Sequence, residues 1–218
     1  MLRRLVCDDA YERHIRSLGA TRIAGVDEVG RGALFGPVVA AAVVLPEQIT
    51  FTGLRDSKQL RPKDRERLAE QIEGCALALS IAAIDAATID RINIYQATRL
   101  AMLEAVSGLA LAPDHLLIDA MRLDHPCPQT SIVYGDSLSL SIAAASVVAK
   151  VYRDRLMCEL DAQYPQYGLA AHKGYGTARH CAALREHGVT PLHRQSFAPV
   201  AEQLPLPSLS QTPQEPRP

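Results

Sequence analysis

The segment PVVAAAVVL at residues 37–45 limits the folds open to this chain more than any other part of the sequence. It is an uninterrupted apolar run rich in β-branched residues, which predicts a strand that is buried on both faces. A shorter apolar run, Ile23 to Asp27, precedes it, and the link between the two contains Gly30, Gly32 and Gly36. Because this link is short and rich in glycine, we expect the two strands to pair as an antiparallel hairpin.

Hydrophobic periodicity and capping residues predict the other elements. Strands are expected at residues 77–83, 115–119 and 131–134, and helices at residues 9–18, 62–73, 93–106, 142–160 and 177–187. Strands first, followed by strands that alternate with helices, predict an α/β layer fold with a mixed sheet. The length of 218 residues fits one domain, which we place at residues 1–200. The Pro-, Ser- and Gln-rich stretch at residues 201–218 is predicted to be disordered.

Three apolar runs end at or just before an acidic residue. IAGV is followed by Asp27 and Glu28, LLI by Asp119, and IVYG by Asp136. Acids are disfavoured inside strands, and strand ends at one edge of a sheet would bring such side chains together. Any one of these acids taken alone is more often a turn cap, but the same pattern in three runs favours a cluster. Clustered carboxylates need cations, and oxygen ligands suit Mg²⁺ or Mn²⁺ in a two-metal phosphodiester site.

The overall composition permits such a site without requiring it. The formal net charge is −1 and the isoelectric point is near 6.6, whereas nucleic-acid-binding proteins are often basic. Phosphate contacts would therefore have to come from local patches. The five cysteines are scattered without a CxxC pair, which argues against a disulfide framework or a zinc site and favours a cytoplasmic protein. No apolar run approaches the roughly 20 residues of a membrane span, so no membrane partner is expected.

The segment GVDEVGRG at residues 25–32 joins the first acids to a glycine turn. Its spacing is that of a phosphate-binding loop, but the Lys and the Ser or Thr of that motif are missing. A dinucleotide fingerprint is also excluded, because Phe35 stands at the third glycine position and a strand follows. What remains is a tight turn that lets the backbone approach a sugar and places Arg31 where it can hold a phosphate. The alternative is an ordinary hairpin turn with a solvated arginine.

Seven segments of the chain match one known family in the same order. They are GVDEVGRGALFGPVVAAAVVL at 25–45, LRDSKQL at 54–60, INIYQAT at 92–98, LLIDA at 116–120, GDSLSLSIAAASVVAKVYRDRLM at 135–157, AHKGYGTARH at 171–180 and HRQSFAPV at 193–200. The family that they resemble is ribonuclease HII, the type 2 ribonuclease H, and the first and fifth segments are highly specific. The resemblance implies an RNase H-like fold, in which helices flank a mixed five-stranded sheet, with a helical C-terminal part at about residues 160–200.

The resemblance also implies an activity and the residues that perform it. The family hydrolyses RNA in RNA–DNA hybrids and incises DNA on the 5′ side of an embedded ribonucleotide, leaving 3′-hydroxyl and 5′-phosphate ends. These reactions serve ribonucleotide excision repair and RNA primer removal. The expected catalytic and metal-binding residues, with Mg²⁺ or Mn²⁺, are Asp27, Glu28, Asp119 and Asp136. The expected substrate-binding residues are Gly30, Arg31 and Gly32 at the ribose 2′-hydroxyl and Tyr175 on the following sugar. Lys58 and Lys173 stand beside motif residues, and from this position we expect them to contact phosphates.

The sequence departs from the family pattern at one position near the predicted site. Leu138 stands two residues after Asp136, where the family commonly has Lys or Arg. This departure predicts weaker substrate binding or a stronger metal requirement. In the tail, Gln203 to Leu206 faintly resembles the short peptides that dock on bacterial sliding clamps, but four residues are a weak basis for a partner. The chain is expected to act as a monomer.

Two other functions are compatible with parts of the pattern. One is a nucleic-acid-binding module that has kept the fold without catalysis, which would be indicated by loss of one of the four acids. The other is a different carboxylate-metal nuclease of the same fold, such as a resolvase or transposase. Such enzymes act on DNA without a 2′-hydroxyl, and they would not need the GRG turn or Tyr175.

Overall fold

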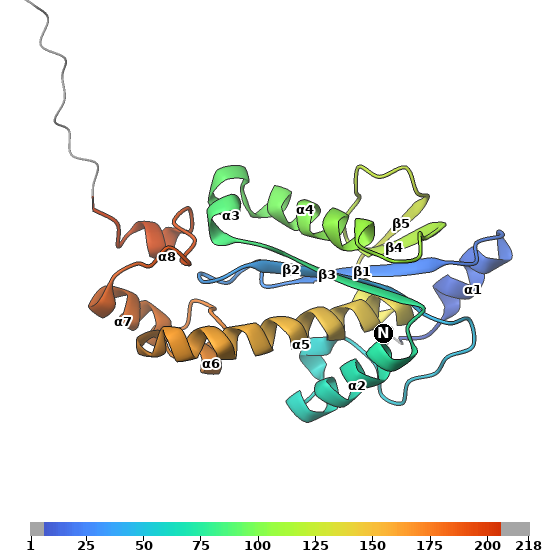
Figure 1. Cartoon of the computed structure of the whole chain (residues 1–218), viewed down its shortest axis with the longest axis horizontal. Helices are drawn as coiled ribbons and strands as arrows, with labels where there is room; N and C mark the ends of the chain where they lie inside the picture. Colours follow the sequence, from blue (N-terminus) through green and yellow to red (C-terminus); the bar gives the residue numbers. More distant parts are fainter. Residues whose placement is uncertain (1–6, 206–218) are drawn as a thin grey trace, which may run out of the picture.

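A mixed sheet of five strands lies at the centre of the structure (Figure 1). The structure is a computed structural model that describes residues 7–205. The strands are β1 (Ile23–Val29), β2 (Val38–Val44), β3 (Ala78–Ile84), β4 (His115–Asp119) and β5 (Gln129–Ile132), in the order β3-β2-β1-β4-β5 across the sheet. β2 is antiparallel to β1 and β3, whereas β4 is parallel to β1 and β5. These pairings confirm the predicted mixed sheet and the predicted hairpin.

Helices cover both faces of the sheet, as the apolar sequence of β2 requires. Helices α3 (Ala86–Ile92) and α4 (Ile94–Ser107) lie on one face, and α2 (Pro62–Cys75) and α5 (Leu140–Gln163) lie on the other (Figure 1). Side chains alternate along a strand, so the even-numbered residues of β2 pack against α4 and the odd-numbered ones against α2 and α5. All seven residues of β2 are buried, which confirms the sequence interpretation.

The first half of α5 lies unusually close to β1. A Cβ atom at Gly25 would lie 2.1 Å from the carbonyl carbon and oxygen of Ser141, so only glycine allows this approach. The N-terminus of α5 is fixed by α1 (Ala10–Ser17), because the buried Glu12 accepts hydrogen bonds from Ser139 Oγ at 2.7 Å and Ser141 N at 2.8 Å. A carboxylate at a helix N-terminus also interacts favourably with the helix dipole. These contacts place the start of α5 beside the sheet edge that carries the acids.

The C-terminal part is helical, as predicted, and gathers beyond one end of the β1–β2 hairpin (Figure 1). It consists of η3 (Pro165–Tyr167), α6 (Leu169–His172), α7 (Ala178–His187) and α8 (Ala198–Ala201). Phe35, in the link of the hairpin, is fully buried among these helices, with its ring centroid 4.7 Å from that of His193 and 6.2 Å from that of Tyr167. The hairpin link is therefore held by the C-terminal helices.

Three local expectations differ from the structure. β1 runs on to Val29, so Asp27 and Glu28 lie inside the strand and not at its end. β5 ends at Ile132, two residues earlier than expected, because the chain turns at Tyr134, which has a left-handed backbone with φ of 60°. Helix α3 was not predicted; it begins with the side chain of Asp85 accepting from Thr88 N, and it is separated from α4 by Asn93.

The predicted tail begins within the described part of the chain. Ala201 is the last residue of α8, and turns follow up to Leu204. Residues 206–218 lie outside the described range, and with them the last residue of the segment that resembles clamp-binding peptides. Within residues 7–205, no helix has both the length and the apolar character needed to cross a membrane.

Candidate functional site

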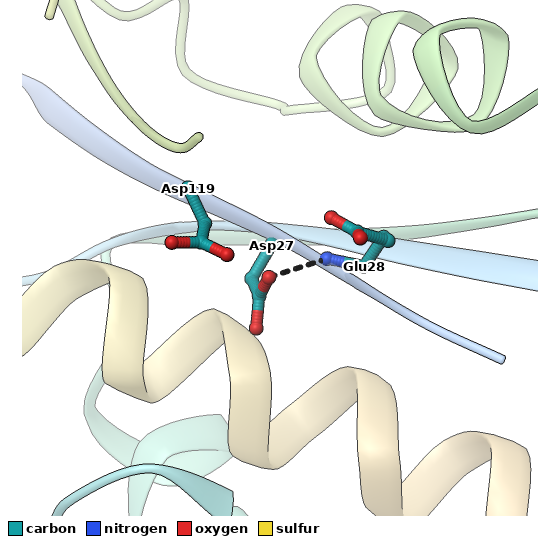
Figure 2. A group of neighbouring side chains, drawn as sticks. All are labelled: Asp27, Glu28 and Asp119. Carbon is teal, nitrogen blue, oxygen red and sulfur yellow. Dashed lines mark hydrogen bonds between the residues drawn. The ribbon is translucent and has the colours of Figure 1, made fainter. Parts of the chain in front are cut away.

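Three of the four predicted acids meet at the junction of β1 and β4. Because these strands are parallel neighbours, with Val26 paired to Ile118, the residues that follow, Asp27 and Asp119, come side by side. Asp27, Glu28 and Asp119 each offer a carboxylate oxygen within 4.8 Å of the others. Figure 2 shows Asp27 directed toward α5, with Glu28 N donating a 2.8 Å hydrogen bond to its carboxylate. The cluster predicted from sequence is therefore present for these three residues.

Asp136 lies beside this group and not within it. It belongs to η2 (Gly135–Ser137), the turn between β5 and α5. The turn is tied to the cluster because Gly135 N donates a 2.8 Å hydrogen bond to Asp119 Oδ1. Asp136 is buried, and this burial raises its pKa to about 6, with the charges of Asp56 and Asp119 adding to the effect. Asp56, in the DSK segment, is an acid of this site that sequence reasoning overlooked.

The carboxylates of the cluster are buried close together, which disfavours their ionised forms. Burial raises the pKa of Asp27 well above its usual value, and the carboxylates of Glu28 and Asp119 raise it further. Burial also raises the pKa of Glu28, although Arg31, whose Nη1 lies 3.4 Å from Glu28 Oε1, opposes this. Buried carboxylates that repel one another are stabilised as anions by a cation between them. An all-oxygen donor set of this kind fits Mg²⁺ or Mn²⁺ and is a poor fit for zinc.

A cavity of about 410 Å³ opens beside the acids. Most of the predicted substrate residues line it, together with one of the acids and four residues that the sequence did not single out. The lining comprises Glu28, Val29, Gly30, Arg31, Gly32, Ser57, Lys58, Ser146, Lys150 and Tyr175. Lys173 does not line this cavity; its Nζ donates to Cys158 Sγ at 3.0 Å and to Ala170 O at 2.8 Å. The structure thus brings together every predicted substrate residue except Lys173.

Lys58 faces the acids. Burial lowers its pKa, but the carboxylates of Asp56, Asp136, Asp27 and Glu28 outweigh this effect, and the net shift is upward. The position of Lys58 is set by the short helix η1 (Ser57–Gln59), where the side chain of Asp56 accepts from Lys58 N at 2.9 Å. Its ammonium group thus supplies the acids with one positive charge from the protein itself.

The GRG turn and the loop of Tyr175 approach each other closely. Leu34 N donates to Gly174 O at 2.8 Å, and a Cβ atom at Gly32 would lie 3.9 Å from the Tyr175 ring. Gly30 has a left-handed backbone with φ of 91°, and a Cβ there would lie 2.2 Å from Arg153 Nε. Glycine is therefore required at residue 30, both by its conformation and by the arginine behind it.

Two fully buried arginines hold this region from behind. Arg153 donates to the carbonyl oxygens of Phe35, Pro37 and Lys173, and its guanidinium lies 5.6 Å from the centroid of the Tyr175 ring. Arg194 donates to the carbonyl oxygens of Gly36 and Arg31. Neither forms an ion pair with a carboxylate in the part of the chain that the structure describes. Sequence patterns gave no reason to expect buried arginines here.

Fold and site together define a class of protein: an α/β domain of the RNase H type with a carboxylate site suited to divalent ions. Residues 24–200 match the family described as "Ribonuclease HII". The "Ribonuclease HII" of Geobacillus kaustophilus is 58% identical over 194 residues, which is 89% of this chain and 75% of that protein. The "Ribonuclease HII" of Koribacter versatilis is 58% identical over 200 residues, or 92% and 79% of the two chains. The chain belongs to the ribonuclease HII family and is accordingly a ribonuclease H, a phosphodiester hydrolase.

Solved structures agree with this assignment. The ribonuclease H2 of Pyrococcus horikoshii superposes with a TM-score of 0.72 at 25% identity, over 83% of this chain and 96% of that one. The RNase HII of Archaeoglobus fulgidus, solved as a complex with PCNA, gives a TM-score of 0.69 at 24% identity, over 81% and 95% of the two chains. The RNase H-like fold implied by the sequence is confirmed.

Proposed function

We propose that this chain is an endonuclease that hydrolyses RNA in RNA–DNA hybrids and incises duplex DNA on the 5′ side of an embedded ribonucleotide. The products would be a 3′-hydroxyl and a 5′-phosphate, as required for ribonucleotide excision repair and primer removal. The observation that carries this proposal is the direct connection between acids and cavity: Glu28 belongs to the carboxylate cluster and also lines the cavity with the GRG turn and Tyr175.

The metal site that we propose consists of Asp27, Glu28, Asp119 and Asp136. The chemistry that bound divalent ions supply at such sites is the activation of an attacking water and stabilisation of the leaving oxygen. Asp27 and Glu28 are held by β1, Asp119 by β4 and Asp136 by η2, so the donors come from rigid elements. A solved structure with 22% identity is described as Bst-RNase HIII in complex with Mn²⁺. Either Mg²⁺ or Mn²⁺ fits the oxygen donors here.

Recognition of the ribonucleotide is assigned to the GRG turn and Tyr175. Gly30, Arg31 and Gly32 line the cavity beside Glu28, and their backbone groups are proposed to donate to or accept from a 2′-hydroxyl there. The half-exposed ring of Tyr175 lies across the same cavity and offers a flat apolar face for the next sugar. Lys58 is proposed to contact the phosphate at the acids, while Lys173 is proposed to contact a phosphate outside this cavity.

The test is incision of a DNA duplex that contains one ribonucleotide, compared with the same duplex made entirely of DNA. We expect a single cut on the 5′ side of the ribonucleotide, no cut in the all-DNA duplex, and loss of cutting in Asp136→Asn. Cutting of both duplexes would instead indicate a different carboxylate-metal nuclease. Binding without any cutting by the wild-type protein, in the presence of Mg²⁺ or Mn²⁺, would indicate a non-catalytic binding module.

Location and assembly stay predictions. The cytoplasmic location is supported by five cysteines without a disulfide partner. The monomer is proposed as an expectation.

A further inference from the structure

A second groove, of about 650 Å³, adjoins the cavity at the acids. It lies between the start of α2, the second half of α5, and α6, and Lys150 lines both spaces. Its charged lining residues are Arg65, Glu66, Lys150, Asp154, Arg155 and Lys173. This is the groove to which the structure assigns Lys173, the one predicted substrate residue that the first cavity leaves out.

The two spaces follow one another along α5, and Lys150 lines both. Ser146, Lys150, Asp154 and Cys158 are spaced four residues apart, so their side chains follow one stripe of the helix. Ser146 and Lys150 line the first cavity, while Lys150, Asp154 and Cys158 line the second. The stripe covers twelve residues, or about 18 Å at 1.5 Å per residue. At roughly 3.4 Å of duplex axis per nucleotide, this length spans about five nucleotides.

The groove has a net positive charge, whereas the whole chain does not. It holds four cationic side chains and two carboxylates, an excess of two positive charges, whereas the whole chain has a formal net charge of −1. Asp154 is shared by two cations, with Lys150 Nζ 2.6 Å and Arg65 Nη2 3.5 Å from its oxygens. Among residues 7–205, the ammonium group of Lys173 donates only to uncharged acceptors, Cys158 Sγ and Ala170 O. Charge of this sign attracts phosphates.

The charge of Lys150 is not fully compensated by the protein. Burial lowers the pKa of Lys150, and the neighbouring charges of Arg65 and Arg153 add to this, against the ion pair with Asp154. An anion in the groove would favour the charged form of Lys150. The ammonium form of Lys150 would therefore be more favourable with a phosphate in the groove than without one.

We propose that this groove binds the phosphodiester backbone of the cleaved strand on the 3′ side of the ribonucleotide. The direction rests on the proposed function, in which the acids hold the phosphate 5′ to the ribonucleotide and Tyr175 packs on the following sugar. α5 follows the same order: Ser146 lies close enough to Asp27 to lower the pKa of that carboxylate, Lys150 lies beside the cavity of Tyr175, and the groove lies beyond. The strand passes from the acids to the groove in the 5′ to 3′ direction.

The groove variant that tests this carries Arg155→Gln and Lys173→Gln, both at positions where the side chain reaches solvent. Its control carries Arg13→Gln and Arg67→Gln, which remove the same charge from α1 and from an exposed position of α2 that does not line the groove. Affinity for duplexes with one ribonucleotide is measured in the Asp136→Asn background by fluorescence anisotropy. Thermal melting shows that both variants are folded.

The cleaved strand is shortened on its 3′ side from about eight to about two nucleotides, with a long 5′ flank to keep the duplex annealed. The parent is the Asp136→Asn protein without further changes. We expect it to bind about tenfold more weakly when the 3′ side is shortened, and to change little when the 5′ side is shortened instead. The groove variant should bind the long duplex about as weakly as the parent binds the short one, with a salt slope smaller by about two. The control should behave as the parent does.

Sensitivity to the 5′ flank in place of the 3′ flank, or a groove variant that responds to shortening as the parent does, would overturn the proposal. Failure of the proposed function has a different signature, because the protein with all four acids would then not cut the long-flanked duplex at all.

Discussion

At the scale of single residues, the carboxylate of Asp27 is buried in an electrostatically unfavourable position. It lies in β1 against α5, and both its burial and the charges of Glu28 and Asp119 disfavour its ionised form. A group in this position is expected where function, and not stability, determines the residue. The same conflict explains why an acid occurs in the interior of a central strand, where propensity alone disfavours it.

Asp27→Asn is therefore expected to stabilise the metal-free protein while abolishing cleavage. Asparagine keeps a carbonyl oxygen to accept from Glu28 N but carries no charge to repel its neighbours, so the gain should be about 1–2 kcal/mol. The measurement is thermal melting in a chelator and again with Mn²⁺, together with activity. The wild type should be stabilised by Mn²⁺ and the variant much less. A variant that melts below the wild type in chelator would contradict this reasoning.

Leu138→Lys is predicted to tighten substrate binding or reduce the metal requirement. Leu138 is half-buried beside the cluster of Ile15, Leu117 and Ile142, and it follows directly on η2, which carries Asp136. The aliphatic stem of a lysine can keep part of this packing while its ammonium group reaches solvent, so the loss of stability should stay below about 1 kcal/mol.

The measurement for Leu138→Lys is KM at several Mg²⁺ concentrations, with Leu138→Met as the uncharged control. Equal KM and equal metal dependence in the two variants would show that a basic residue at this position is unimportant.

At the scale of elements, the position of Asp136 depends on how α5 begins. Glu12 of α1 is 2% exposed and accepts from Ser139 Oγ and Ser141 N, directly after η2. α1 is thus a clamp on the start of α5, although the two segments are more than 120 residues apart in the sequence. The amphipathic pattern predicted α1 itself, but nothing in that pattern indicated what the helix holds.

Glu12→Ala should lower stability by about 2–4 kcal/mol, because it leaves the buried hydroxyl and amide donors at the α5 terminus unpaired. We expect faster amide hydrogen exchange in residues 135–142 and weaker metal binding, with α4 protected as before. Glu104→Ala, at an exposed position of α4, is the control. Unchanged exchange at residues 135–142 would show that α1 does not position the turn of Asp136.

Element boundaries were predictable where periodicity was strong and were missed where turns intervene. β2 was correct because its side chains are apolar on both faces and no other structure buries them so well. β5 was placed two residues too far along because Val133 and Tyr134 look like strand residues but are exposed in a turn. α3 was overlooked because its seven residues are too few to show a clear period.

At the scale of the whole molecule, buried histidines join the C-terminal helices to the hairpin. His193 and His180 are fully buried, with their Nε2 atoms 3.3 Å apart, and His193 packs edge-on against Phe35. Burial lowers the pKa of His193 to about 4, and the nearby His180 adds to this. Both rings are thus held neutral in the folded protein, and their protonation opposes the packing of the C-terminal part.

The free energy of unfolding is therefore expected to fall when acid protonates His180 and His193. The folded pKa of His193 is below its unfolded value near 6.5, so the unfolded chain binds the proton first. The stabilisation that comes from burying neutral His193 is complete above about pH 6.5. It is lost as the pH falls toward 4, and its size is roughly 3 kcal/mol. Asp136 acts in the opposite sense, because its raised pKa favours the folded state as the pH falls.

Comparison with His193→Gln isolates the histidine from the carboxylates. Urea denaturation from neutral pH to about pH 4.5 should show the stability advantage of the wild type over the variant shrinking by roughly 2–3 kcal/mol. An advantage that stays constant over this range would mean that protonation of His193 does not limit the acid stability of the fold.

The sequence alone determined the hairpin, the α/β class, the acids and the family, because these follow from local patterns and from motifs that stand in continuous segments. Beyond the hairpin, only the tertiary structure decided which strands become neighbours. Asp27 and Asp119 meet because β1 and β4 pair in parallel across about 90 residues of chain, and no periodicity specifies that partner. For the same reason, the burial of Arg153 and Arg194 and the groove beside α5 were evident only from the tertiary structure. Periodicity determines how a segment is buried, whereas packing between distant segments determines which side chains meet.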